Sequence, residues 1–304
     1  MDERKGLLFV LLTALVSGVS IFANSFAVKG FDPFVFVFLK NAAVAAFIFS
    51  IIILIKDFAA IKALTRKQVG KLAAIGLIGG SVPFLLFFYA LKFTTAINAG
   101  FLHKTLFIWA TVFAVIFLRE KISKAYMAGA VLLLAGNFML FNISSFGIPE
   151  MLILGATMFW AAENAIAKNA LAELSGRMVA FGRMFFGSIF VLAFLVFTNQ
   201  VGPLFELSVP QIYWALIASG FLFAYVLTYY SGLKYIPLHK AASVLLLAQP
   251  ITAVLSFAFL GNAITLSQTF GLFLIVAGVF FAIGFGAFTR AITSKGLFIA
   301  AKRN

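Results

Sequence analysis

Ionisable side chains interrupt four long apolar stretches of the sequence: Lys40, Lys104, Glu163 and Arg183. A charge inside an apolar span is costly, so each of these residues is a candidate functional residue. Lys104 lies about ten residues into its stretch, roughly 15 Å along a helix, and cannot easily reach the surface from there. We expect Lys104 to face either a wet cavity that holds an anion or a counter-ion on another span.

Glu163 is the only acidic residue well inside an apolar stretch. Two roles are open for it. It can be protonated in one conformation and ionised in another, which would couple the protein to protons, or it can permanently neutralise Lys104 or Arg183. Either role requires Glu163 to lie among the other buried polar groups.

Polar residues recur at helical spacing in two of the apolar stretches. Thr13, Ser17, Ser20 and Asn24 follow one another at intervals of four, three and four, which places them on one face of a helix. A second group consists of Trp160, Glu163 and Asn164. Small polar residues also serve ordinary helix packing, but Trp160 and Glu163 exceed that need. We expect both faces to line a central cavity, with Asn24, Trp160 and Asn164 in contact with a ligand.

Catalytic and metal-binding patterns are not found. The chain has no cysteine, and its two histidines, His103 and His239, form no metal-binding motif. Paired catalytic acids and a nucleophile beside a base are also missing from the sequence. We therefore expect neither an enzyme nor a bound cofactor.

The composition determines which elements position these residues. Of the 304 residues, 63% are hydrophobic and 11% charged, and the mean hydropathy is +1.12. Soluble domains carry about a quarter of their residues as charges, so we expect an all-α integral membrane protein. Apolar runs predict ten transmembrane helices. They are Gly6–Ala27, Pro33–Ile55, Leu72–Leu91, Thr95–Leu118, Ser123–Phe141, Pro149–Ala167, Met178–Phe197, Gln211–Leu233, Leu238–Leu260 and Leu266–Phe288.

The basic residues behind the net charge of +14 are distributed unequally between the two sides of the predicted membrane protein. With the N-terminus inside, almost every lysine and arginine between spans falls on the inner side, and only Lys29 and Lys92 fall outside. This pattern follows the positive-inside rule and predicts a multi-pass protein of the cell membrane with both termini cytoplasmic. Anionic lipid headgroups are the expected partner of the basic loops, and nucleic acid is not needed to explain them.

The second half of the sequence repeats the first. Leu91-Lys92 matches Leu233-Lys234 at an offset of 142 residues, and Lys40 matches Arg183 at 143. Because each repeat holds five spans, an odd number, the two copies must insert with opposite orientations. We expect repeats at residues 1–145 and 146–304, the second ending in a cytoplasmic tail. The equivalence of Lys40 and Arg183 favours a structural role, such as bonding exposed carbonyls, over a substrate role, which stays open.

Motifs along the chain resemble the drug/metabolite transporter superfamily, specifically its EamA-type members. They are Leu118-Arg119-Glu120-Lys121, Gly129, Leu132-Leu133-Leu134-Ala135-Gly136, Gln249-Pro250, Gly271 and Ala277-Gly278-Val279. The chain departs from this pattern where Gly261-Asn262 replaces the acidic residue often found at the end of the ninth span. The resemblance implies a ten-helix, two-repeat fold and export of amino acids or related metabolites.

Together these observations predict a secondary transporter, an exporter, that works by alternating access around a midplane cavity. Buried cations outnumber buried acids, which favours a small substrate that carries a carboxylate. The predicted substrate-binding residues are Lys104, Glu163, Trp160, Asn164, Asn24, Lys40 and Arg183. The alternative is an exchanger of phosphorylated anions, such as sugar phosphates or nucleotide sugars, for which the three basic residues must converge on one ligand. A monomer and a homodimer are both compatible with the sequence.

Overall fold

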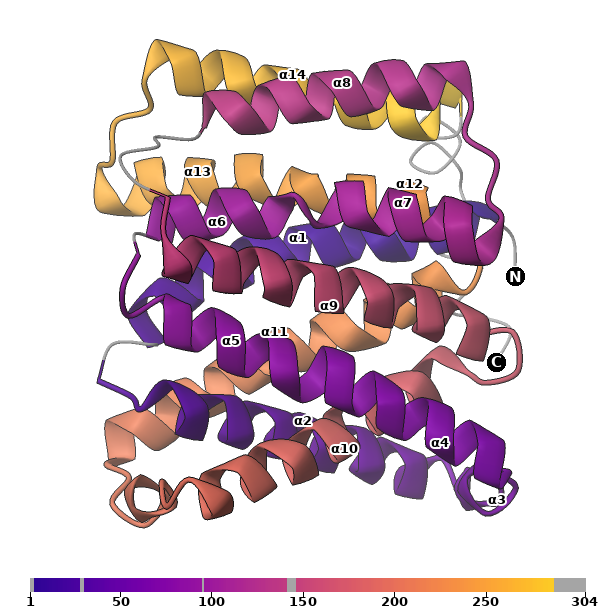
Figure 1. Cartoon of the computed structure of the whole chain (residues 1–304), viewed down its shortest axis with the longest axis vertical. Helices are drawn as coiled ribbons and strands as arrows, with labels where there is room; N and C mark the ends of the chain where they lie inside the picture. Colours follow the sequence, from indigo (N-terminus) through magenta and orange to yellow (C-terminus); the bar gives the residue numbers. More distant parts are fainter. Residues whose placement is uncertain (1–2, 28–29, 95, 141–145, 287–304) are drawn as a thin grey trace.

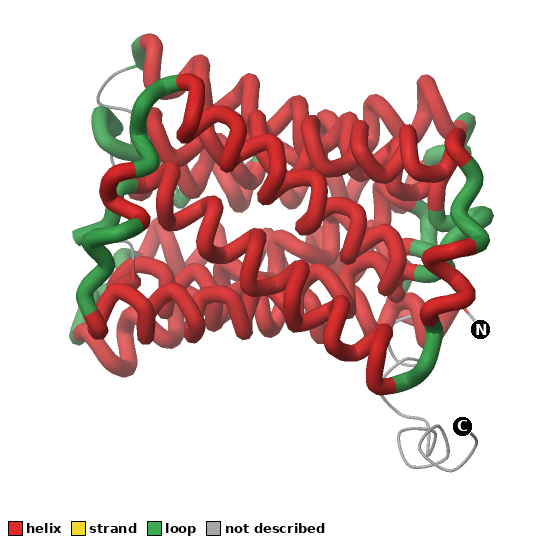
Figure 2. The backbone as a smooth tube through the Cα atoms, turned by 90° about the horizontal axis from the view of Figure 1, so that it is seen from below, coloured by secondary structure: helices red, strands yellow, loops and turns green. Residues whose placement is uncertain are grey.

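The structure, a computed structural model, describes residues 3–27, 30–94, 96–140 and 146–286. These residues form helices that run back and forth between two ends of a bundle, and none of them forms a strand (Figure 1, Figure 2). The helices of the first half are α1 (Glu3–Ala27), α2 (Pro33–Leu54), α3 (Phe58–Lys62), α4 (Arg66–Ile75), the π-helical segment η1 (Gly76–Ser81), α5 (Val82–Ala90), α6 (Ala96–Lys104), α7 (Leu106–Leu118) and α8 (Lys124–Met139). Those of the second half are α9 (Ile148–Ala170), α10 (Gly176–Phe197), η2 (Gly202–Leu204), α11 (Val209–Leu233), α12 (Leu238–Val244), η3 (Leu245–Leu247), α13 (Ala248–Leu260) and α14 (Leu266–Ile283).

Ten spans are formed by the described helices, at the positions that the apolar runs predict. The third span joins α4, η1 and α5, the fourth joins α6 and α7, and the ninth joins α12, η3 and α13. The third span begins at Arg66, earlier than the predicted Leu72, because Thr65 and Gln68 form a capping box that starts the helix before the apolar run. The prediction of an all-α membrane protein with ten helices in two repeats is confirmed.

By length and composition, eight helical segments among the described residues can cross a membrane, and α8 is a shorter apolar helix. Helix α9 is long enough but is not among the eight. It carries Glu163 and Asn164, both buried, near its middle. Helix α9 thus carries a buried acid and a buried amide side by side, as expected for functional intramembrane residues.

Basic loops gather at one end of the bundle, on the right of Figure 1, where α3 and the N-terminus lie. We call this end the basic end. Hydrogen bonds between helix ends and loops stabilise it, including Lys71 to Glu173 at 2.9 Å, Arg177 to Asp57 at 2.9 Å and Lys234 to the Leu174 carbonyl at 2.9 Å. Lys92 is the one basic side chain between spans that the described residues place at the opposite end. The charge asymmetry in the sequence is therefore an asymmetry of the folded bundle.

The two halves have opposite orientations: α1 leaves the basic end, whereas α9 runs toward it (Figure 1). Helices α8 and α14, the last spans of each half, pack closely together. A Cβ on Gly129 would lie 2.6 Å from the Gly278 carbonyl oxygen, and one on Gly136 would lie 2.5 Å from that of Gly271. Gly129 corresponds to Gly271 and Gly136 to Gly278 in the repeat, so each contact is the image of the other across a pseudo-two-fold axis.

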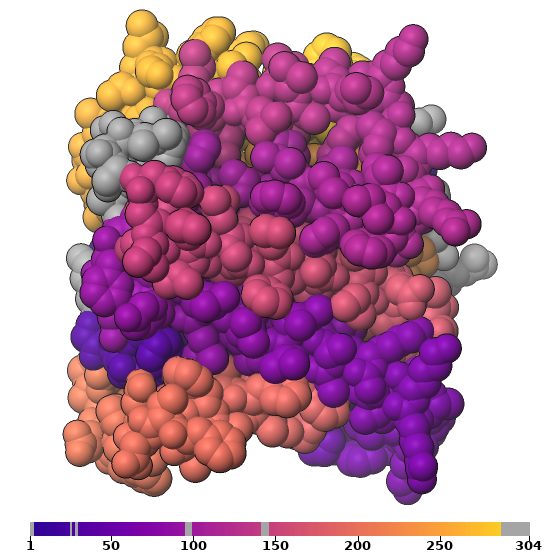
Figure 3. All heavy atoms as spheres, viewed as in Figure 1, coloured from indigo at the N-terminus to yellow at the C-terminus, as the bar shows by residue number. Residues whose placement is uncertain are grey.

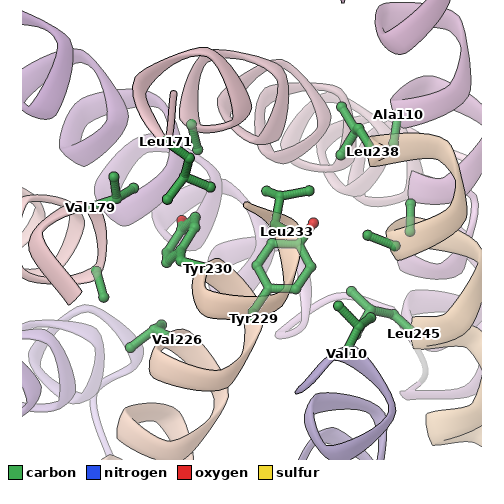
Figure 4. Close-up of a cluster of buried hydrophobic side chains, with 14 of the residues drawn as sticks. Val10, Ala110, Leu171, Val179, Val226, Tyr229, Tyr230, Leu233, Leu238 and Leu245 are labelled. Carbon is green, nitrogen blue, oxygen red and sulfur yellow. The ribbon is translucent and has the colours of Figure 1, made fainter. Parts of the chain in front are cut away.

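The interior is a continuous apolar cluster to which both halves contribute. Figure 4 shows its centre, where Tyr229 and Tyr230 of α11 point to different sides: Tyr230 lies toward Leu171 and Val179, and Tyr229 lies nearer Val10 and Leu245. Figure 3 shows the face formed by α8, α7, α9, α5 and α4, whose side chains close most of the gaps between these ribbons.

Some predictions fall on residues outside the described ranges. These are the boundary between the repeats at residues 145 and 146 and the tail after the tenth span, together with Lys29 and the basic residues Arg290, Lys295, Lys302 and Arg303. They stay predictions.

Candidate functional site

A small cavity lies where the fourth and ninth spans meet. We call it the Lys104 cavity; it is lined by Ser17, His103, Lys104, Leu106, Phe107, Tyr225, Ala242, Leu245 and Leu246. Its volume is about 40 Å³. At roughly 10–15 Å³ per water molecule, it has room for about three waters in this conformation.

Both spans that form the Lys104 cavity are broken beside it. Helix α6 ends at Lys104 and α7 begins at Leu106, while η3 separates α12 from α13 at Leu245–Leu247. Lys104 corresponds to Leu246 at the repeat offset of 142, so the two breaks are equivalent. Broken helices with free backbone groups facing a cavity are the usual substrate site of repeat-built transporters.

The two breaks have different local causes. In the ninth span, Pro250 lacks the N–H that would bond to the Leu246 carbonyl four residues earlier. In the fourth span, the Thr105 backbone N–H and hydroxyl both bond to the Leu102 carbonyl, at 3.1 and 2.6 Å. This local bonding competes with the regular helical ladder and tightens the turn. The break is thus caused by Thr105 in the first half and by Pro250 in the second half.

Lys104 is the charged residue of the cavity, and its side chain is only 7% exposed. Among the described residues its ammonium group has no hydrogen bond and no ion pair, so the predicted alternative of an ion pair with Glu163 is not formed in this conformation. Its position at the end of α6 places the cation beside the helix's partly negative carboxyl end, which stabilises it. The charge is left free to meet an anion that enters the cavity.

A second group of polar residues surrounds Gly79, in the π-helical segment of the third span. Because Pro83 has no N–H to offer, the Gly79 carbonyl four residues earlier loses its helical partner. Two side chains replace it: Trp160 Nε1 and Arg183 Nη2 each donate to Gly79 O at 3.0 Å. Arg183 thus bonds a free carbonyl, the kind of contact that its repeat position favoured, and its substrate role stays a prediction.

Glu163 belongs to the same group. The Tyr230 hydroxyl donates to Glu163 Oε1 at 2.6 Å. The side chain packs directly on Gly79, where a Cβ would lie 2.2 Å from Glu163 Cγ. We call Gly79, Trp160, Glu163, Arg183 and Tyr230 the Gly79 cluster.

Two chains of ring contacts connect the Gly79 cluster to the Lys104 cavity. The His103 ring, which lines the cavity, meets the Trp160 ring edge-on with centroids 4.9 Å apart. On α11, Tyr225 of the cavity stacks on Tyr229 at 5.7 Å, and Tyr229 meets Tyr230 at 5.5 Å. The structure therefore brings Lys104, Trp160, Glu163 and Arg183 into one continuous region.

Lys40 reaches that region through phenylalanine rings: Phe88 stacks on Phe84, which meets the Trp160 ring edge-on. The Lys40 ammonium group lies 4.8 Å from the Phe36 ring centroid and 5.8 Å from that of Phe88, with no hydrogen bond or ion pair among the described residues. Its neighbour Asn41 bonds the π-helical segment instead, donating to the Gly80 carbonyl at 2.6 Å. The repeat equivalence of Lys40 and Arg183 therefore does not extend to their contacts.

The predicted polar face of α1 divides between packing and the cavity. Thr13 is fully buried and donates to the Thr228 hydroxyl at 2.9 Å, a packing contact, whereas Ser17 lines the Lys104 cavity. Asn24 donates to the Ser20 hydroxyl at 3.1 Å, and its Oδ1 is buried without a partner in the described structure. Asn164 is buried on α9, one residue from Glu163. Both asparagines stay predicted ligand contacts.

At the basic end, Glu120 links the loop after α7 to the start of α12. Its carboxylate accepts from the backbone N–H groups of Leu238 and His239, at 2.7 and 3.3 Å, and from His239 Nδ1 at 2.5 Å. Burial raises the pKa of Glu120, but these hydrogen bonds outweigh it and hold the pKa below its usual value. Tyr126 adds a bond between its hydroxyl and that of Ser243 at 3.2 Å. The loop after α7 and the start of α8 are thereby bonded to α12 across the two halves.

Among the described residues, no three His, Asp or Glu side chains lie close enough together to hold a metal ion. Residues that the sequence did not single out complete the region, above all Tyr230, Asn41 and Gly79. The signal available for them was the glycine-rich run Gly76–Ser81, which ends two residues before Pro83 and is unusual inside an apolar span.

Comparison with known proteins gives consistent matches. The sequence profile of the EamA-like transporter family matches residues 4–142 and again residues 147–284. An uncharacterized transporter of Clostridium kluyveri is 27% identical over 293 residues, covering 90% of this chain and 92% of that protein. An uncharacterized transporter of Archaeoglobus fulgidus is 30% identical over 192 residues, covering 62% of this chain and 61% of its own. A crystal structure with 16% identity and a TM-score of 0.70 covers 91% of this chain and 98% of the other, and shows a common fold.

Proposed function

Since the chain belongs to the EamA-like transporter family and is a multi-pass membrane transporter, we propose that it is a secondary carrier for a small carboxylate-bearing metabolite, such as an amino acid. The observation that supports this most directly is the free ammonium group of Lys104 at the point where both broken spans meet. A buried cation without a protein partner favours an anionic ligand. The family and the relatives are transporters, which gives no indication of catalysis.

In this proposal Lys104 holds the substrate carboxylate, while Ser17 and Tyr225 of the same cavity supply hydroxyl groups beside it. Glu163, Trp160, Asn164 and Asn24 shape the remaining pocket, with Glu163 available to an amino group or a proton. Arg183 and Lys40 stay candidates: Arg183 reaches the region through the Gly79 cluster, and Lys40 reaches it through phenylalanine rings.

We assign the transport mode to alternating access. The present cavity is too small for a metabolite, so binding requires the halves to separate. At the basic end the loop after α7 is bonded to α12, whereas α6 and α13 make at most slight contact at the other end in the described residues. Opening on the α6–α13 side therefore breaks fewer contacts. Charge asymmetry supports a cytoplasmic basic end beside anionic headgroups, with export as the net direction.

An exchanger of phosphorylated anions has less support. It needs Lys40, Lys104 and Arg183 around one ligand. In this conformation Arg183 is bonded to Gly79 O and Lys40 lies on phenylalanine rings, away from Lys104.

The test is counterflow into liposomes that contain the purified protein, with labelled amino acids, dicarboxylates and sugar phosphates as probes. The wild type is compared with Lys104→Ala and with Lys71→Ala, a matched lysine whose bond to Glu173 lies at the surface of the basic end. We expect saturable counterflow of one carboxylate class that Lys104→Ala abolishes and Lys71→Ala retains. Counterflow that survives Lys104→Ala in a folded protein would refute the assignment of the anion site.

A further inference from the structure

Glu163 has fewer partners than a buried carboxylate needs. Tyr230 donates to Oε1, but Oε2 is buried without a partner, and no Lys, Arg or His nitrogen of the described residues lies at ion-pair distance. An ionised carboxylate in this place would lose its hydration and gain one neutral hydrogen bond in return. Burying the neutral acid costs far less than burying the charge. This conformation is therefore suited to protonated Glu163.

Arg183 provides the nearest counter-charge, yet it is occupied elsewhere. Its Nη2 donates to Gly79 O at 3.0 Å, its guanidinium lies 5.9 Å from the ring centroids of Phe84 and Tyr230, and its Nε is buried without a partner. Glu163 and Arg183 come from two helices of the second half and meet at the same glycine of the first. Gly79 of the first half therefore contacts both Glu163 and Arg183, which form no ion pair with each other in this conformation.

Resting on the carrier function proposed above, we propose that Glu163 is a proton-binding site that couples transport to the proton gradient. In the conformation described, the side chain is a neutral acid bonded to Tyr230. In the alternate conformation it releases its proton to water on the other side of the membrane, and the resulting carboxylate pairs with Arg183. That pairing competes with the bond from Arg183 to Gly79, so the proton controls a contact between the two halves.

Other titratable groups face Glu163 from the helices packed around it. Helix α10 contributes Arg183, and α11 contributes Tyr225, Tyr229 and Tyr230. Helix α6 carries His103, whose ring lies on Trp160 rather than on the acid, and Lys104, which lines the neighbouring cavity. The His239 ring of α12 is bonded to Glu120 instead. None of these facing groups is a second carboxyl group. Among Glu163 and the groups that face it, Glu163 alone can therefore give the infrared C=O band of a protonated carboxyl group.

The first test needs no substrate. Infrared difference spectra of the purified protein at neutral pH are recorded for the wild type, Glu163→Gln, Glu163→Asp and Glu173→Gln, the last a matched change at an exposed glutamate. We expect a protonated-carboxyl C=O band that Glu163→Gln removes and that both other variants keep. A spectrum unchanged by Glu163→Gln would show that Glu163 is ionised and would overturn the proposal.

The second test uses the labelled probe that shows counterflow, in liposomes with and without an imposed pH gradient. For one proton per substrate, a gradient of one pH unit shifts the steady-state substrate ratio of the wild type up to about tenfold. Whatever transport Glu163→Gln retains should not respond to the gradient, and a normal response in this variant would refute the coupling. Absence of counterflow from every probe in the wild type would instead reject the carrier function, while the infrared result would stand by itself.

Discussion

The Glu120 carboxylate of the first half and the His239 ring of the second half lie 2.5 Å apart, between Oε2 and Nδ1. At the opposite end of the bundle, the position equivalent to Glu120 is Asn262, whose side chain makes no hydrogen bond among the described residues. Among the described residues, the bond between Glu120 and His239 therefore has no symmetric counterpart at Asn262. Breaking that bond should favour opening toward the basic end.

Glu120→Gln should open the Lys104 cavity to the basic end. Hydrogen bonds to a charged acceptor are worth about 1.5–3 kcal/mol each, so loss of the charge should raise the open population about tenfold or more. The chain has no cysteine, so a single Ser17→Cys reports access to the cavity. We expect an impermeant thiol reagent on the basic side to label Ser17→Cys faster when Glu120→Gln is present.

Glu173→Gln is the control for that experiment. Glu173 bonds Lys71 at the same end of the bundle, but its side chain is 46% exposed, and exposed pairs contribute little. It should leave the labelling rate unchanged. Equal labelling in all three backgrounds would show that Glu120 does not hold the basic end closed.

Acid should reproduce the effect of Glu120→Gln. The pKa of Glu120 lies below its ordinary value of 4.5 despite burial, because His239 and two backbone N–H groups donate to its charged form. A carboxyl group with a lowered pKa stabilises the closed state fully above pH 4.5, and this contribution is lost as the pH falls through the lowered pKa. Relative to an exposed cysteine on the same side, whose labelling falls equally as the thiolate is lost, labelling of Ser17→Cys should therefore rise only at pH values below 4.5. In the Glu120→Gln background this rise at low pH should be missing. A rise that persists there would come from the titration of another group.

The spans could be predicted from the sequence because the bilayer imposes them. A span must be long and apolar, and repeated landmarks such as Gly129 and Gly271 record the symmetry that the folded pair then shows. The start of the third span at Arg66 was missed because a capping box extends a helix independently of hydropathy.

The site was only partly predictable for physical reasons. Charge cost alone identifies Lys104 and Glu163 as buried functional candidates. Their partners depend on backbone geometry that hydropathy does not record: Pro83 frees the carbonyl of Gly79, and Thr105 breaks the fourth span through its own hydroxyl. Tyr230 was indistinguishable from core tyrosines until it was seen bonded to Glu163.

Gly129→Ala should destabilise the protein by about 1–3 kcal/mol. The added Cβ would lie 2.6 Å from the Gly278 carbonyl oxygen and 2.7 Å from the Ala282 nitrogen, which are backbone atoms that cannot move aside. Gly155→Ala is the matched control, since that helical glycine has no atom within 4 Å of the added Cβ. It should be neutral or stabilising by up to about 1 kcal/mol. Unfolding by SDS titration measures both, and equal stabilities would show that α8 and α14 are not closely packed.

Lys40→Met and Arg183→Met should have opposite effects on stability although the two positions are equivalent in the repeat. Lys40 is 6% exposed and has only ring contacts, so an apolar side chain of similar length removes a buried charge and should stabilise by about 1 kcal/mol. Arg183→Met removes a hydrogen bond to Gly79 O and should destabilise by about 1–3 kcal/mol. SDS-titrated unfolding of both variants, paired with counterflow, separates structure from transport. A Lys40→Met protein of normal or higher stability that has lost counterflow would assign Lys40 to the substrate, because its ammonium group has no hydrogen bond or ion pair in the described structure to lose.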